Sequence, residues 1–159
     1  MLPDIHTILY ATDLGEHAPR VFRYAMSVAQ RYDARVAIVH ALEPLSPTAR
    51  RLVEDHVSKD VLDSLRREGF DRVARQVRER LARFCEEELG AAGCADRVAE
   101  IVVREGRPSQ VILEEAQRLG ADLIVMGSHG HTAVTEVLLG TTAHRVMQRA
   151  QVPVLLVRV

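Results

Sequence analysis

The sequence predicts an α/β fold in which helices cover both faces of a parallel sheet. Five short apolar segments alternate with stretches whose apolar residues recur every three to four positions, which is the pattern of repeated β-α-β units. The apolar segments are continuous rather than alternating, as expected for strands covered on both faces. Right-handed crossovers between such strands give a doubly wound sheet. At 159 residues the chain suits a single domain, which we assign to residues 1–159.

The first half of the chain holds two of the predicted strands. In order, the predicted elements are a strand over 7–11, a helix from Val21 to Tyr32, a strand over 35–41 and a helix over 61–89. Pro44 and Pro47 interrupt the pattern, so residues 42–60 are predicted as a connector or as a lid over a ligand. Gly69 marks a break in the long helix.

Three more strands are predicted in the second half. The elements are a loop over 90–96, a strand over 98–104, a helix from Pro108 to Gly120, a strand over 122–126, a loop over 127–131, a helix from Val134 to Ala150 and a strand over 153–157. Proline suits the first position of a helix, and glycine suits the position just after one.

Composition excludes several functional classes. The 21 basic and 22 acidic residues give a net charge of −1, which argues against a nucleic-acid binder. Cys85 and Cys94 are too few for a disulfide framework or a four-cysteine zinc site, so we expect two reduced thiols. The longest apolar run, 152–157, is too short to span a membrane, and no signal peptide is visible. We therefore expect a cytoplasmic protein without membrane contact.

Two predicted loops qualify as a ligand site. Ligands of open parallel sheets bind beyond the carboxyl ends of the strands, where the strand order reverses. Asp13 lies in the loop after the first strand, and Gly127 and Gly130 lie in the loop after the fourth. Glycines let backbone N–H groups approach an anion, and a following helix start adds further donors, so phosphate is the natural ligand. The alternative is an ordinary strand–helix turn.

Gly140 lies inside an otherwise helical pattern. Glycine costs about 1 kcal/mol relative to alanine in a helix interior, so a specific requirement is expected. Either a ligand or neighbouring backbone comes close to it, or the helix begins near Gly140 after an extended phosphate loop. Tight packing of the helix against the sheet is the remaining explanation.

The spacing of these residues resembles the nucleotide motif of the universal stress protein family. That motif is Gly, two residues, Gly, nine residues, Gly, then Ser or Thr. It falls here on Gly127, Gly130, Gly140 and Thr141. Asp13 matches the aspartate that the family carries after its first strand, and Val152-Pro153-Val154 matches its last step. The resemblance covers essentially the whole chain.

The resemblance implies an ATP-binding domain whose five strands have the order 3-2-1-4-5. It also implies that Asp13 lies beside the ribose or beside a Mg²⁺ ion bound with the phosphates, and that a homodimer forms through the last strand by Val154, Leu156 and Arg158. The implied nucleotide-binding residues are Ala11, Thr12, Asp13, Ala41, Met126, Gly127, Ser128, His129, Gly130, Gly140, Thr141 and Thr142.

This chain departs from the family pattern at several positions. His131 stands where members often carry Arg or Lys, and the loop after the first strand lacks the usual serine. Glu16 and Glu136 bring negative charge toward a triphosphate, which weakens its binding. We therefore expect Mg²⁺ to offset that charge.

The favoured function is a nucleotide-dependent regulatory module of a stress response. One alternative is a slow Mg²⁺-dependent ATPase that uses Asp13, with His129 assisting, and another is a structural stress protein that binds no nucleotide. The chain lacks the dinucleotide fingerprint, the P-loop lysine and the Gly-x-Ser-x-Gly elbow, so we expect at most weak ATP hydrolysis. His17, His129 and His131 are predicted to be loop histidines without a metal.

Overall fold

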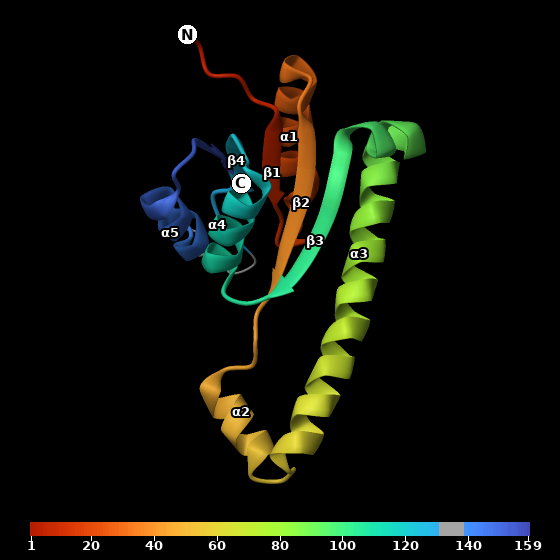
Figure 1. Cartoon of the computed structure of the whole chain (residues 1–159), viewed down its shortest axis with the longest axis vertical. Coiled ribbons are helices and arrows are strands. Elements are labelled where there is room, and N and C mark those ends of the chain that lie inside the picture. Colours follow the sequence, from red (N-terminus) through yellow and green to blue (C-terminus); the bar gives the residue numbers. More distant parts are fainter. Residues whose placement is uncertain (131–138) are drawn as a thin grey trace.

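Five parallel strands form one sheet in the order β3-β2-β1-β4-β5 in the computed structural model, which describes residues 1–130 and 139–159 (Figure 1). The elements are β1 (Thr7–Ala11), α1 (Ala18–Tyr32), β2 (Arg35–Leu42), α2 (Pro47–Glu54), α3 (Lys59–Arg97), β3 (Val98–Glu105), α4 (Pro108–Leu119), β4 (Leu123–Gly127), α5 (Thr141–Arg149) and β5 (Val154–Val157). The predicted doubly wound fold and strand order are confirmed.

The central strand β1 lies between β2 and β4, both of which follow it in the sequence. Tyr10 pairs with Ile38 of β2 on one side and with Val125 of β4 on the other. The chain therefore winds outward from β1 in both directions, and the strand order reverses between β1 and β4. That reversal positions the candidate site.

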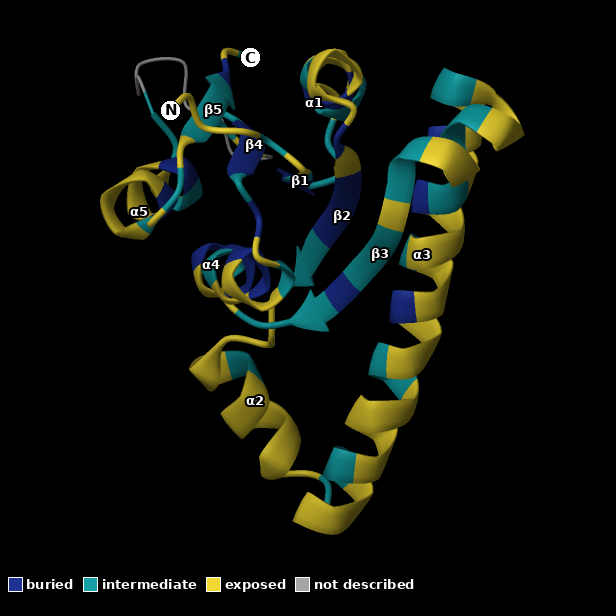
Figure 2. Ribbon diagram, turned by 45° about the horizontal axis from the view of Figure 1, so that its top comes forward, coloured by how far each residue is buried: buried dark blue, intermediate teal, exposed yellow. Residues whose placement is uncertain are grey.

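Helices cover both faces of the sheet, and each face has its own core (Figure 2). On one face α1 and α3 pack over Ile8 and Tyr10, and the ring of Phe22 lies between Tyr10 at 5.4 Å and Phe84 at 5.0 Å. On the other face α4 and α5 pack over the side chains of β1, β2 and β4 that point the opposite way. The two-residue period of the strands assigns alternate side chains to the two cores.

The region between β2 and β3 differs from the prediction. Residues 42–60 contain the helix α2, whose start is capped by Ser46 Oγ accepting from Ala49 N at 3.2 Å. The helix α3 runs through Gly69 without a break. The predicted loop over 90–96 is wrong, because Gly90 (φ 75°, ψ 161°) only kinks α3 and helical structure resumes as far as Arg97.

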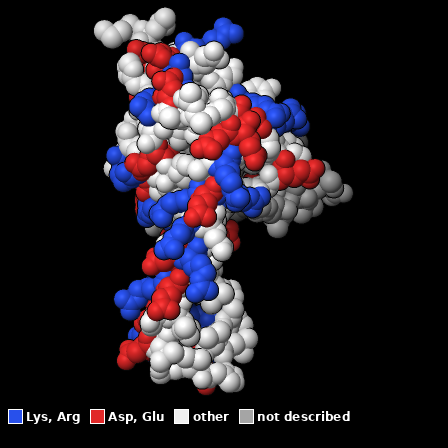
Figure 3. Space-filling model, turned by 90° about the vertical axis from the view of Figure 1, so that its right-hand side faces the viewer, with Lys and Arg blue, Asp and Glu red and all other residues white. Residues whose placement is uncertain are grey.

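The helices α2 and α3 form an arm that extends past the carboxyl ends of β2 and β3 (Figure 1). No residue of α2 is buried. Basic and acidic side chains are intermixed along the flank of the arm seen in Figure 3. No helix within residues 1–130 and 139–159 is long and apolar enough to cross a membrane.

Two further predictions concern Cys85, Cys94 and the last helix. The sulfurs of the two cysteines are bonded to each other, so the prediction of two reduced thiols is wrong. Most of the stretch predicted as the start of the last helix, including Val134 and Glu136, lies outside the described residues, as does His131. Within the described part, α5 begins at Thr141, which agrees with the alternative of a helix beginning near Gly140.

Candidate functional site

The candidate site lies at the carboxyl edge of the sheet, where β1 and β4 end side by side. The helix α1 leaves β1 toward one face of the sheet, and α5 leaves the β4 side toward the other. The loops that follow β1 and β4 therefore diverge from each other at the reversal of strand order, which is where open parallel sheets bind their ligands.

The loop after β1 holds the Asp13 carboxylate against its own backbone. Thr12 N donates to Val39 O at 3.0 Å, which continues the pairing of β1 with β2. Thr12 Oγ1 then accepts from Leu14 N at 3.1 Å, and Asp13 Oδ1 accepts from Gly15 N at 2.8 Å. These turns hold Leu14 in the left-handed region at φ 59° and fix the position of the carboxylate.

The loop after β4 is tied to the end of the chain by Ser128. Ser128 N donates to Val157 O at 2.9 Å, and Ser128 Oγ accepts from Val159 N at 3.3 Å. The same hydroxyl lies 3.1 Å from His129 Nδ1, and the residue is 4 % exposed. Its side chain therefore anchors the loop to the residues after β5.

Gly140 lies directly against the backbone of that loop. Its N–H donates to Ser128 O at 2.7 Å. A Cβ at position 140 would lie 3.1 Å from Ser128 O and 3.3 Å from His129 Cα, which is closer than an ordinary contact. The expected close approach of neighbouring backbone is confirmed, and glycine is favoured here because both neighbours are main-chain atoms that must shift to admit a Cβ.

The first turn of α5 begins at this contact. Gly140 is the N-cap residue, and no side chain in the described part of the chain caps the helix. The first N–H groups of a helix have no partner within it, and the positive end of the helix dipole adds to their attraction for an anion. Thr141 and Thr142 are exposed and half-buried residues of this turn.

The Asp13 carboxylate reaches the same place from the β1 side. A Cβ at Gly130 would lie 3.5 Å from Asp13 Oδ2. The β1 loop, the β4 loop and the start of α5 thus meet within contact distance, and we call Asp13, residues 127–130 and residues 140–142 the cradle. Far-apart segments of the sequence supply one carboxylate and several backbone donors, which is a donor set suited to a phosphate with a cation.

The remaining predicted residues border the cradle from the sheet. Ala11 and Met126 are 8 % and 5 % exposed and pack into the core beneath α4 and α5. Ala41 is half-buried near the end of β2. His40, next to it, lies with Nδ1 2.7 Å from Thr12 O, so it braces the β1 loop.

Among these residues, Asp13 is the side chain suited to bind a metal ion. Within residues 1–130 and 139–159, no group of three or more His, Cys, Asp or Glu side chains could hold a metal ion. Mg²⁺ usually keeps several waters and binds through one or two carboxylates together with phosphate oxygens. Asp13 fits that arrangement as the carboxylate contributed by the protein.

Tyr10 is a residue near the site that the sequence did not reveal. Its hydroxyl donates to Ala18 O at 3.0 Å and so fixes the start of α1 beside the β1 loop. Burial raises the pKa of the phenol well above its ordinary value, and the nearby Asp13 carboxylate adds to that rise. Its position in an apolar strand carried no signal of this role.

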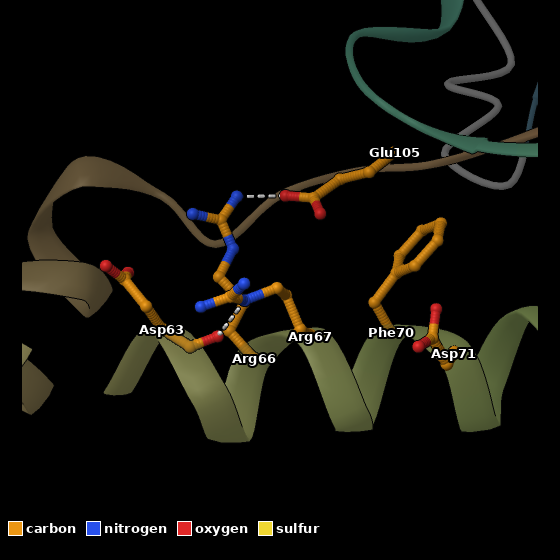
Figure 4. A pocket seen from close by; sticks show the side chains of 6 residues that line it. All are labelled: Asp63, Arg66, Arg67, Phe70, Asp71 and Glu105. Carbon is orange, nitrogen blue, oxygen red and sulfur yellow. Dashed lines mark hydrogen bonds and ion pairs between the residues drawn. The ribbon is translucent and has the colours of Figure 1, made fainter. Parts of the chain in front are cut away.

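A separate hollow of about 380 Å³ lies at the base of the arm, beside the end of β3 (Figure 4). Arg66 is paired with Glu105 across it, and Arg67 Nε donates to Asp63 O at 3.3 Å. Phe70 points into the hollow between them. This hollow therefore has side chains of both charges around it, whereas the cradle is built mainly from backbone.

Known proteins with similar sequences and structures belong to one family. The model of the Universal stress protein family matches residues 4–158. A universal stress protein from Thermus aquaticus is 35% identical over 152 residues, which cover 96% of this chain and 98% of the relative.

One solved structure with this fold is that of the Methanocaldococcus jannaschii protein MJ0577. It has a TM-score of 0.76 at 22% identity, and the match covers 98% of this chain and 96% of that one. A universal stress protein solved in complex with cAMP has a TM-score of 0.57 at 22% identity, and that match covers 98% of each chain.

Proposed function

This chain belongs to the universal stress protein family, and on that premise we propose that it binds ATP and acts as a nucleotide-dependent regulatory module of a stress response. The observation that carries the proposal is the backbone contact at Gly140, which brings the β4 loop against the start of α5. A relative of the same fold was solved with cAMP, which supports an adenine nucleotide as the ligand class.

The phosphate chain would lie in the cradle, held mainly by main-chain donors. The glycines at 127 and 130 leave room for a phosphate next to the backbone, and the first turn of α5 adds N–H groups and the hydroxyls of Thr141 and Thr142. The ribose and base would extend along the ends of β1 and β2, past Ala11 and Ala41. No charged side chain is required for this mode of binding, which suits a loop that lacks lysine.

Asp13 would contribute through Mg²⁺ rather than through the phosphate directly. A carboxylate next to a polyphosphate repels it unless a cation lies between them. The turn that fixes Asp13 Oδ1 on Gly15 N, together with the approach of Oδ2 to Gly130, aims the carboxylate toward the cradle. Mg²⁺ held by Asp13 would neutralise charge on the phosphates.

The substitution Asp13→Asn tests the proposal, because its effect on ATP affinity should be opposite with and without Mg²⁺. With Mg²⁺ present, the variant should bind ATP about tenfold or more weakly, since a contact to a charged group is worth about 1.5–3 kcal/mol. With EDTA present, it should bind ATP about threefold more tightly, because removing a unit charge ~7 Å from a phosphate in a water-like dielectric is worth about 0.6 kcal/mol. Isothermal titration calorimetry under the two conditions measures both effects.

Glu16→Gln is the matched control, because it removes a charge from the same loop at an exposed position. It should give a small gain in affinity without Mg²⁺ and no loss with Mg²⁺. Absence of ATP binding by the wild-type chain at millimolar nucleotide with Mg²⁺ would refute the proposal and favour a structural stress protein. Steady release of ADP that Asp13→Asn abolishes would favour the slow ATPase.

We further propose that the protein is a homodimer that pairs through β5. This strand is the edge of the sheet next to β4, and Val154 and Leu156 are only half-buried. Arg158 follows as an exposed residue. An edge strand with apolar side chains presents unpaired backbone groups and apolar area, and pairing with a second copy about a two-fold axis covers both.

A further inference from the structure

The two cysteines lie on either side of the kink in α3, and their sulfurs form a disulfide. Their Cα atoms are 5.6 Å apart, within the range that disulfides span. Cys85 is 0% exposed in the core beneath α1, whereas Cys94 is half-buried. Cys85 is therefore shielded from reagents in solution, and Cys94 is the more accessible of the two residues.

From this asymmetry we propose that Cys94 is a site of reversible thiol–disulfide exchange with a low-molecular-weight thiol of the glutathione class, and that Cys85 is its resolving thiol. The proposal is independent of nucleotide binding, since both residues lie away from the cradle on the α1–α3 face.

The exchange is balanced in two steps. In the reduced protein the Cys94 thiolate attacks the disulfide of oxidised glutathione, forms a mixed disulfide and releases one glutathione thiolate. The Cys85 thiol then loses its proton and attacks the Cys94 sulfur, which forms the intramolecular bond and releases the second glutathione. Overall the protein dithiol is oxidised to a disulfide and oxidised glutathione is reduced to two thiols. Reduction of the protein runs the same steps backward, again entering at Cys94.

A hollow of about 410 Å³ lies between α1 and the end of α3, and residues on either side of half-buried Cys94 in the sequence line it. These residues include Gly93 and Asp96. Arg23 and Glu88 lie on its rim as an ion pair of 2.8 Å. Arg23 Nε and Nη2 are both used in this pair, so the hollow offers a small thiol space near Cys94 rather than an open charge.

The disulfide joins the two parts of α3 that the kink at Gly90 separates. After the kink, Arg97 donates to Asp33 Oδ1 at 2.7 Å and to Ala34 O at 3.4 Å, which attaches the last turn of α3 to the loop before β2. Leu89, just before the kink, and Cys94, after it, both pack against the core. With a separation of nine residues, the loss of loop entropy in the unfolded chain predicts that oxidation lowers the unfolding equilibrium constant about 100-fold.

Intact mass spectrometry of the full chain tests the order of attack. The protein is reduced, freed of reductant and mixed with excess oxidised glutathione. Wild type should lose the mass of two hydrogens and carry no adduct, whereas Cys85→Ser should gain one glutathionyl group at Cys94. Cys94→Ser should remain unmodified, because its remaining thiol is buried. Excess reduced glutathione should then restore the dithiol of the wild type and remove the adduct.

A second measurement needs no substitution. Brief alkylation of the reduced wild type, followed by peptide mapping, should label Cys94 well before Cys85, and hydrogen exchange over residues 91–97 should be faster in the reduced form. Each of three results would overturn the proposal: a wild type that stays reduced in excess oxidised glutathione, a disulfide that excess reduced glutathione does not open, or labelling of Cys85 first.

Discussion

The contact at Gly140 gives the sharpest prediction, because the substitution Gly140→Ala adds one methyl group against fixed neighbours. The added Cβ would lie 3.1 Å from Ser128 O and 3.3 Å from His129 Cα. Both atoms belong to the main chain, and Ser128 is anchored to Val157 by its own N–H. The loop must therefore move by a few tenths of an ångström, or α5 must begin elsewhere.

The expected cost follows from that geometry. Forcing an extra carbon into a tight contact costs about 1–3 kcal/mol, and alanine is a poorer N-cap than glycine. Gly140→Ala should therefore lower the free energy of unfolding by about 2 kcal/mol, which for a chain of this size lowers Tm by about 4–8 °C. The displaced donors of the β4 loop should also weaken ATP binding about tenfold, the value of about one hydrogen bond to a charged group.

Gly69→Ala is the matched control. A Cβ at Gly69 meets no atom within 4 Å, and the residue lies in the interior of α3, so alanine should raise the free energy of unfolding by about 0.5–1 kcal/mol and leave ATP binding unchanged. Thermal unfolding and calorimetric titration measure the two quantities on both variants. A Gly140→Ala protein with the wild-type Tm would refute the steric argument, and one with lower Tm but unchanged ATP affinity would limit the contact to a structural role.

Two further predictions concern the core and the edge strand. Tyr10→Phe removes the hydrogen bond to Ala18 O and should cost about 1 kcal/mol at neutral pH. Because burial raises the pKa of this phenol in the folded state, wild-type stability should fall as the pH rises above about 10, where the unfolded tyrosine ionises, and Tyr10→Phe should reduce that fall in urea unfolding curves. Leu156→Lys should convert the dimer into a monomer, as measured by light scattering, whereas the same change at exposed Leu52 on α2 should leave the dimer intact. If only Leu52→Lys gave monomers, the interface would lie on the arm and not at β5.

The strands were predictable because burial leaves a strong pattern in the sequence. Residues 7–11 match β1 at both ends, and the other four strands were placed within one or two residues. The inner strands β1, β2 and β4 have buried apolar side chains on both faces, so their apolar runs were unambiguous. The strand order did not follow from any of these runs and rested on family resemblance, since pairing between parallel strands leaves no local trace.

The arm was harder to predict because little of it is buried. The helix α2 buries no residue, so its apolar pattern carried almost no information, although Ser46 followed by Pro47 is a start signal that could have been used. Gly69 suggested a break, but an isolated glycine costs only about 1 kcal/mol, and the burial of Ala74 and Leu81 on the sheet outweighs it. At Gly90 the chain does leave the helical region, and the disulfide and core contacts beyond it restore the helix.

The cradle shows which part of a site can be found from sequence and which requires the fold. Gly140 was identified as unusual because it contradicted its helical surroundings, and its spacing from Gly130 indicated phosphate binding. That Asp13 lies against Gly130 depends instead on the parallel pairing of β1 with β4, in which Leu9 faces Ile124. This register brings the two strand ends level with each other, and a slip along either strand would separate the carboxylate from the loop. The cation ligand and the phosphate donors therefore form one site only because the strand order reverses between β1 and β4.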